Sequence, residues 1–229
     1  MRRVAAVAAV ACAVLAAGAA RAAPTIECRG LQVCVRVIGP WVVVPASHAR
    51  VEFQLACPRR YLVGGLDAEL SDPAVDISFL GRLGAPVAPG ITTSRTAVFV
   101  ARFVGSSRRT VTFRPHLGCV PSNGAGGGIP TARVVRPGQP AVRRVRTLRV
   151  LPGRTRGVAA GCASAERLIT GSHAVGFWTA QPPAARLVAA VATRQRLVRG
   201  HVVVGARSSL ALGRVRAIVQ VIALCAGGK

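Results

Sequence analysis

One span of this chain occurs twice, and the repetition limits the folds that the chain can adopt. The first copy runs from Cys57 to Cys119 and opens with Cys-Pro-Arg-Arg-Tyr-Leu-Val-Gly-Gly, and the second runs from Cys162 to Cys225. The opening cysteines are 105 residues apart and the closing cysteines 106 apart, so the copies differ in length by one residue. Such agreement predicts an internal duplication and therefore two units with related folds.

Two further pairs fit an alignment in which the extra residue directly follows the first cysteine. Leu62 and Leu168 are 106 residues apart, and so are Gly65 and Gly171. In the first copy, Gly64 and Gly65 follow a short apolar run, and adjacent glycines there predict a bulge or a tight turn.

The first 22 residues have the layout of a secretory signal peptide. Arg2-Arg3 precedes an apolar run over residues 4–20, and Ala20-Arg21-Ala22 forms a small-x-small cleavage site. An uncleaved anchor is the alternative, because 17 apolar residues are at the short limit of a bilayer span. The arginine pair also permits a twin-arginine export signal. We expect cleavage after Ala22, no later transmembrane segment, and a protein that is secreted, extracellular or held in the cell envelope.

Export also decides how the cysteines are interpreted. Six of the seven cysteines remain after cleavage, and an even count in an exported chain favours disulfides. If both copies share a fold, the pairs are Cys57–Cys119 and Cys162–Cys225, which leaves Cys28 with Cys34. The spacing of this last pair is not that of a zinc site, so we expect no metal and no cofactor.

The formal net charge is +24, and the charge is unevenly placed. Six of the seven acids precede residue 77, and only Glu166 follows it. All basic residues except Lys229 are arginines, a bias that a GC-rich genome would also produce. The positive field exists in either case and favours anionic partners.

Alternating apolar and polar residues, as in residues 51–57, predict strands throughout the mature chain. We find no helical stretch, and the second copy has strand candidates that include residues 186–192 and 197–204. The predicted fold is all-β, with two tandem related β-sandwich-like units stapled by disulfides. The predicted segments follow the signal peptide in this order: a β lead segment (23–47), unit 1 (48–122), a Gly-rich and then Arg-rich connector (123–153) and unit 2 (154–229).

The connector is the predicted anion-binding segment, because it is rich in arginine and contains no acid. A solvated connector enriched by genomic bias is the alternative. The expected partner is an anionic envelope polymer or a lipid headgroup. Nucleic acid is not expected, because the chain has nine aromatic residues in all and most fall in apolar strand patterns. The predicted contact residues are Arg133, Arg136, Arg143, Arg144, Arg146 and Arg149.

Motifs that would identify a reaction are absent from the sequence: there is no Gly-x-Ser-x-Gly elbow and no His-Glu-x-x-His. Asp67 and Glu69 would share one face of a strand, and His116 lies three residues before Cys119. A hydrolase with a site between the two units, using Asp67, Glu69 or His116, is therefore the alternative to a binding protein. A cationic membrane-active factor is a further alternative.

Three segments carry a resemblance: the opening at 57–65, the Gly-Pro-Trp-Val-Val-Val-Pro lead at 39–45, and the His-Leu-Gly-Cys-Val-Pro closure at 116–121. Together they resemble uncharacterised exported proteins of high-GC actinobacteria. The resemblance implies a bacterial, β-rich extracellular protein and carries no known activity. The second copy departs from this pattern at Ala163 and Thr170. We therefore expect an exported, non-catalytic binding or structural protein.

Overall fold

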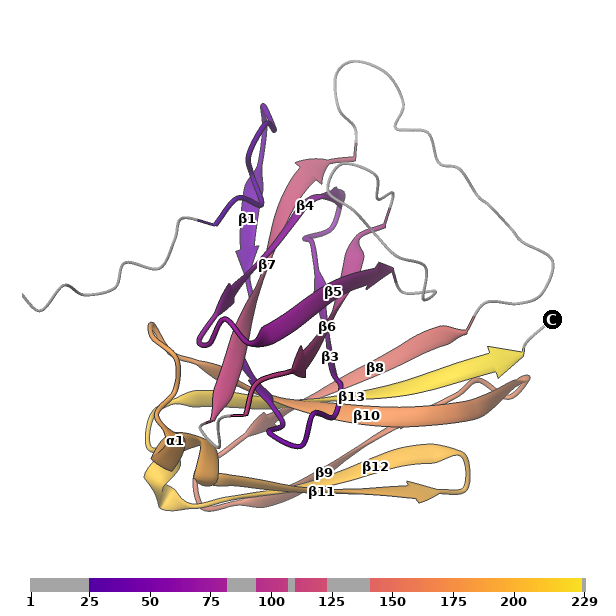
Figure 1. Cartoon of the computed structure of the whole chain (residues 1–229). Helices are drawn as coiled ribbons and strands as arrows, with labels where there is room; N and C mark the ends of the chain where they lie inside the picture. Colours follow the sequence, from indigo (N-terminus) through magenta and orange to yellow (C-terminus); the bar gives the residue numbers. More distant parts are fainter. Residues whose placement is uncertain (1–24, 82–93, 107–109, 123–140, 228–229) are drawn as a thin grey trace, which may run out of the picture.

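The computed structural model describes residues 25–81, 94–106, 110–122 and 141–227. The predicted signal peptide, Arg133 and Arg136 lie outside the described residues. The described chain is almost entirely β-structure, arranged as two related sandwich-like units stapled by three disulfides (Figure 1). No helix in these segments is long and apolar enough to cross a membrane.

The first unit has two facing sheets. Strands β3, β6 and β5 form one sheet, and β7 pairs with β4, β1 and β2 in the other. Phe53, Phe99, Phe103, Phe113 and Leu117 are buried between the sheets. The strands are β1 (Val35–Ile38), β2 (Trp41–Val44), β3 (Val51–Ala56), β4 (Tyr61–Leu70), β5 (Val75–Gly81), β6 (Thr96–Phe103) and β7 (Val111–Pro121).

The second unit repeats this strand order. Strands β9, β12 and β11 form one sheet, and β8, β13 and β10 lie opposite, with Val202, Val204, Val219 and Val221 buried between them. The elements are β8 (Val142–Val150), β9 (Thr155–Gly161), β10 (Glu166–Trp178), α1 (Ala185–Ala189), β11 (Val191–Val198), β12 (His201–Ser208), the 3-10 helix η1 (Leu210–Leu212) and β13 (Arg216–Gly227).

The lead segment and the connector each contribute to a unit. Strands β1 and β2 follow one another along β7, with a break at Gly39-Pro40, and β8 runs along β13 in the same way. The strands of residues 35–44 therefore pair within the sheet of unit 1, and β8, from the predicted connector, pairs within the sheet of unit 2.

The strand register also corrects the predicted alignment. Val63 lies opposite Cys119, and Leu168 lies opposite Cys225, so these two residues are equivalent at a spacing of 105. Each strand then has a bulge, at Gly64 in β4 and at Ile169 in β10. The extra residue of the second copy therefore does not follow its first cysteine directly.

Each long disulfide joins the two sheets of its own unit. Cys57 directly follows β3 and is bonded to Cys119 on β7, and Cys162 directly follows β9 and is bonded to Cys225 on β13. The third disulfide, Cys28–Cys34, closes a short loop before β1. These three pairs are the ones predicted from the matching cysteine positions in the two copies.

Two local predictions in the second copy were wrong. Residues 185–189 form helix α1, because Ala, Arg and Leu are good helix formers and the strand starts only at Val191. Residues 197–204 are not one strand but the two arms of a hairpin. Its turn residues, Arg199 and Gly200, have φ values of 45° and 75°. Glycine at the second position suits the positive φ values of such a two-residue turn.

The units join through both backbone and side chains. Trp41 and Val42 of β2 pair with Phe177 and Gly176 of β10, so one sheet of each unit belongs to a continuous seven-stranded sheet. Strand β3 also packs against the outer face of the second unit. There Gln220 of β13 exchanges two hydrogen bonds with the backbone of Gln54, at 2.6 and 3.0 Å.

Candidate anion-binding face

Two of the predicted anion contacts form ion pairs with carboxylates of the protein itself. The side chain of Arg143 is 6% exposed and forms a two-point ion pair with Glu52 of the first unit, at 2.6 and 2.9 Å. Arg144 forms a two-point pair with Glu166, and this hydrogen bonding raises the pKa of its guanidinium above the ordinary value. Both guanidinium groups are therefore engaged by acids of the described chain, through charge-assisted hydrogen bonds.

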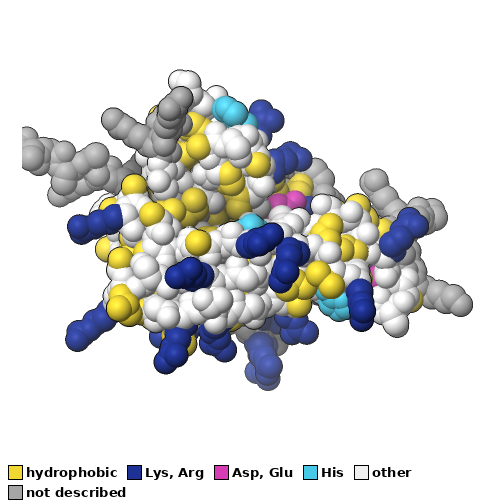
Figure 2. Space-filling view, turned by 90° about the horizontal axis from the view of Figure 1, so that it is seen from below, with side chains coloured by type: hydrophobic (Ala, Val, Ile, Leu, Met, Phe, Trp, Pro, Cys, Tyr) yellow, Lys and Arg dark blue, Asp and Glu magenta, His cyan; other side chains and the backbone are white. Residues whose placement is uncertain are grey.

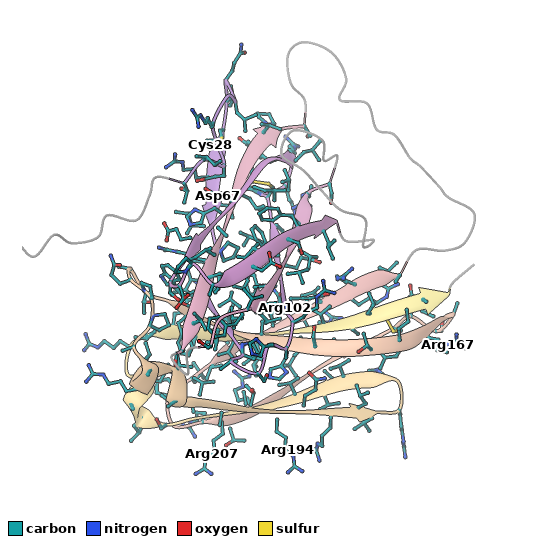
Figure 3. The ribbon with its side chains drawn as sticks, viewed as in Figure 1. Cys28, Asp67, Arg102, Arg167, Arg194 and Arg207 are labelled. Atoms are coloured by element: carbon teal, nitrogen blue, oxygen red, sulfur yellow. A yellow bond between two sulfur atoms is a disulfide. The ribbon has the colours of Figure 1, made fainter. Side chains whose placement is uncertain are left out.

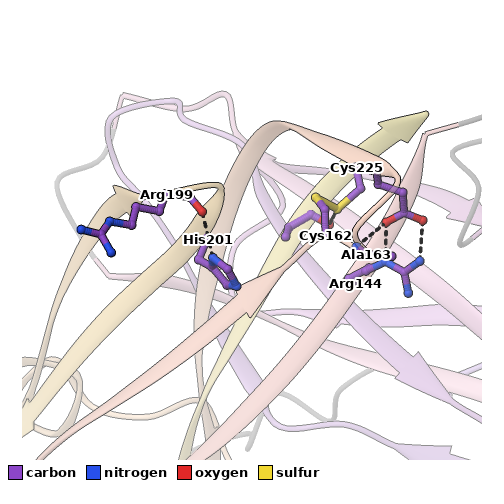
Figure 4. The surroundings of a disulfide bond; sticks show 8 residues. Arg144, Cys162, Ala163, Arg199, His201 and Cys225 are labelled. Carbon is purple, nitrogen blue, oxygen red and sulfur yellow. Dashed lines mark hydrogen bonds and ion pairs between the residues drawn. A yellow bond between two sulfur atoms is a disulfide. The ribbon is translucent and has the colours of Figure 1, made fainter. Parts of the chain in front are cut away.

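The other described members of the predicted set, Arg146 and Arg149, are exposed on β8. Strand β8 is the edge strand of its sheet, and charged side chains on an edge discourage pairing with other chains. Arg146 and Arg144 line a recess of about 290 Å³ that also includes Cys162. Figure 4 shows Arg144 beside the Cys162–Cys225 disulfide. Only one of these two arginines is free of an internal ion pair, so the recess offers a single available cation.

The predicted catalytic candidates come together on the first unit. His116 lies opposite Asp67 in the β4–β7 pair. Its Nδ1 is 3.7 Å from Oε1 of Glu27, and its Nε2 is 3.6 Å from Oε1 of Glu69. Asp67 accepts a hydrogen bond from the backbone N–H of Ile26. Sequence reasoning did not include Glu27, because it belongs to the lead segment and no motif connects it to His116.

The lead segment covers this cluster. The side chain of Glu27 is fully buried, and that of His116 is 2% exposed. The carbonyl oxygen of Glu27 packs on Gly65 and Gly118, where an added Cβ would lie 1.7 and 2.0 Å away. Burial lowers the pKa of His116, and the carboxylates of Glu69 and Glu27 oppose this shift only in part. A substrate cannot reach His116 in this arrangement, so the cluster favours a structural role.

One other group of metal-ligating residue types lies close together in the described residues. The sulfur atoms of Cys162 and Cys225 and a carboxylate oxygen of Glu166 are within 4.8 Å of one another. The two sulfurs are bonded to each other, and Glu166 is held by Arg144. Metal ions bind thiolates rather than disulfides, so this group does not form a metal site.

The outer face of the β9–β12–β11 sheet is the strongest candidate for a binding surface. Val202, Val204 and Ala206 of β12 point into the core, so the alternate residues of all three strands point outward. This outward face is named the β9–β12–β11 face below. Its central cross-strand rows are Arg194–Gly205–Gly157, Arg196–Val203–Ala159 and Ala192–Arg207–Thr155.

Two glycines pair in register at the centre of this face. Gly157 of β9 lies opposite Gly205 of β12, and neither has a positive φ. A Cβ added at either position would have no neighbour nearer than 3.8 Å, so the fold does not require glycine there. Glycine inside a strand lowers stability, and it often marks a place where a ligand approaches the backbone closely.

The arginines of this face form no ion pair with any residue that the structure describes. Arg194 and Arg207 project from the lower sheet, away from the sandwich (Figure 3). Among the described residues, neither they nor Arg196 contact an acid, and the one acid of the second unit, Glu166, is paired with Arg144. The view from below shows many arginine side chains and little acidic surface (Figure 2). The face is thus flat at its centre and positively charged.

The equivalent strand of the first unit, β3, contacts the second unit. There, Glu52 and Gln54 point outward from β3 and contact the second unit. Their counterparts 105 residues later are Gly157 and Ala159, which are exposed. The second unit therefore has an outer face without a partner in the described chain.

A signal for this face is present in the sequence but is weak. Arg194 and Arg196 alternate with partly buried residues, as outward side chains of a strand do. Their relation to Gly157 depends on pairing between distant strands.

Comparisons with protein-family models, curated proteins and solved structures gave no match.

Proposed function

We propose that this chain is an exported, non-catalytic protein of the cell envelope or extracellular space that binds an anionic polymer on the β9–β12–β11 face. The observation that carries the proposal is the register-paired Gly157 and Gly205 beside three arginines that have no acidic partner in the described part of the chain. A polymer chain can approach the backbone closely at the glycines while its anionic groups contact the arginines. The three disulfides support an oxidising compartment.

The geometry favours a polymer over a small anion. Arg194 and Arg196 are two residues apart on one strand, so their Cα atoms are separated by about 7 Å. Arg207 lies diagonally across from Arg194 on the neighbouring strand. These cations are spread over an open sheet and do not converge on one point, so they can contact successive anionic groups of one chain.

A hydrolase receives less support from the structure. His116 is buried beneath the lead segment, which supplies Glu27, and Asp67 accepts a hydrogen bond from that segment. A general acid or base has to come within hydrogen-bonding distance of its substrate. This cluster would meet that requirement only after the lead segment moved away.

The test compares two triple variants of the oxidised chain that begin at residue 23. R194Q/R196Q/R207Q removes the cations of the face, and R29Q/R59Q/R60Q removes three exposed arginines of the first unit. We expect the face variant to bind immobilised dextran sulfate about 100-fold more weakly at low salt. Each arginine near an anionic surface contributes about 1 kcal/mol, and 1.4 kcal/mol is about tenfold in affinity.

The control variant should lose much less affinity, because it keeps the local arrangement of the face. Equal losses in both variants would show that only the total charge matters and would contradict the proposal. Binding by the natural sequence should also weaken as salt is raised toward physiological strength. An absence of binding to dextran sulfate, to polyphosphate and to isolated envelope would likewise overturn it.

A further inference from the structure

Three exposed aliphatic side chains occur at one end of the second unit. Leu197 is 62% exposed, Val198 45% and Ile169 54%. Leu197 and Val198 directly precede the β11–β12 turn, and Ile169 is the bulge residue of β10. Single exposed aliphatic residues are common, whereas a group of them at one end of a domain indicates an interaction site.

A hydrogen bond between β10 and β11 shows that these strands bring Ile169 and Leu197 to the same end of the second unit. The Gln195 side chain donates from Nε2 to the carbonyl oxygen of Gly171 at 2.9 Å, which fixes β11 beside β10. Leu197 lies two residues beyond Gln195, and Ile169 lies two residues before Gly171. Because β10 and β11 run in opposite directions here, both residues lie beyond this bond toward the same end. In Figure 1 this end is at the lower right, away from the first unit.

The same end is positively charged. Arg167 lies at the start of β10, where Figure 3 labels it, and Arg199 occupies the hairpin turn (Figure 4). Arg199 has a φ of 45°, a left-handed conformation that glycine or asparagine adopts more easily. The turn itself therefore does not favour arginine. Its carbonyl oxygen accepts a hydrogen bond from His201, while its guanidinium has no acidic partner among the described residues.

We propose that this end of the second unit, formed by Arg167, Ile169, Leu197, Val198 and Arg199, inserts into the surface of an anionic lipid bilayer. Aliphatic side chains can leave water for the boundary between headgroups and acyl chains, while arginines next to them contact lipid phosphates. Glu166, the acid in this region, forms a two-point ion pair with Arg144. The end thus combines apolar area with charge complementary to an anionic membrane. This goes beyond the polymer-binding face, which uses other residues.

The membrane contact can be tested on the oxidised chain from residue 23 with two matched pairs of substitutions. L197S/V198S removes two aliphatic side chains from the proposed end. L151S/L210S removes two exposed leucines near the opposite end, where Leu210 is 79% exposed. We expect L197S/V198S to lower partition onto phosphatidylglycerol vesicles about tenfold, since each lost aliphatic chain removes buried apolar area. The L151S/L210S variant should bind these vesicles as the natural sequence does.

Charge provides a second readout. R167Q/R199Q should also weaken binding to phosphatidylglycerol vesicles by about tenfold, whereas R186Q/R214Q, at the opposite end, should have little effect. The L197S/V198S variant should bind dextran sulfate normally, which separates this proposal from the polymer-binding face. Vesicle binding that L197S/V198S leaves unchanged would overturn the membrane proposal. Equal binding of the natural sequence to phosphatidylglycerol and phosphatidylcholine vesicles would also overturn it.

Discussion

Removing either long disulfide should lower the free energy of unfolding by about 4 kcal/mol, because each closes a loop of more than 60 residues in the unfolded chain. The double variants are C57S/C119S and C162S/C225S. Each disulfide joins the two sheets of its own unit, so the loss should be similar in size for both. A domain is typically stable by only 5–15 kcal/mol in total, and either variant should therefore unfold at much lower urea concentration.

The short disulfide provides the internal comparison. Cys28 and Cys34 are six residues apart, so the same chain-entropy model predicts a loss of only about 2 kcal/mol for C28S/C34S. Urea unfolding of the three variants, monitored by tryptophan fluorescence, ranks their losses in the free energy of unfolding. A larger loss for C28S/C34S than for the long bridges would show that the lead segment, rather than sheet-to-sheet bonding, dominates stability.

Substituting Arg143 alone should destabilise the chain by about 3 kcal/mol, since it leaves the Glu52 carboxylate without its partner between the units. The double variant R143M/E52Q should recover most of this loss, because it removes both charges together. The matched control is R144M. Arg144 is 35% exposed, and the Glu166 carboxylate that R144M leaves still accepts a hydrogen bond from the backbone N–H of Ala163 at 3.0 Å, so the loss should be smaller, about 1–2 kcal/mol.

Urea unfolding of the single and double variants measures this coupling. If R143M/E52Q is as unstable as R143M, the loss comes from packing of the arginine side chain and not from the unpaired carboxylate. If R143M and R144M lose the same amount, burial does not distinguish the two ion pairs. Either result would contradict the role assigned to Arg143 at the contact between the units.

The parts of the fold that follow from local patterns were predictable. Alternation over residues 51–57 predicts β3, and the paired glycines at 64 and 65 predict the bulge of β4. Helix α1 was missed because five residues are too few to show a helical period. The hairpin turn at Arg199-Gly200 was missed because apolar residues on both sides suggest one continuous strand.

The site was harder to predict, because it depends on distant partners. The sequence shows that Arg143 is basic, but not that Glu52, 91 residues earlier, pairs with it. Likewise, Gly157, Gly205 and Arg194 share one row only because β9, β12 and β11 pair in that register. Charge density along the chain therefore indicated the connector, whereas Arg194, Arg196 and Arg207, on the following sheet, come together only through strand pairing.

The most direct test of the polymer-binding face is to measure the stability and dextran sulfate binding of G157T/G205T together. Threonine suits an exposed strand better than glycine, and each substitution should stabilise the fold by about 0.5–1 kcal/mol. The new side chains should also hold the polymer away from the backbone and weaken binding about tenfold, although no charge has changed. A variant that is more stable and binds less would support the account. A variant that is more stable and binds as well as the natural sequence would contradict it.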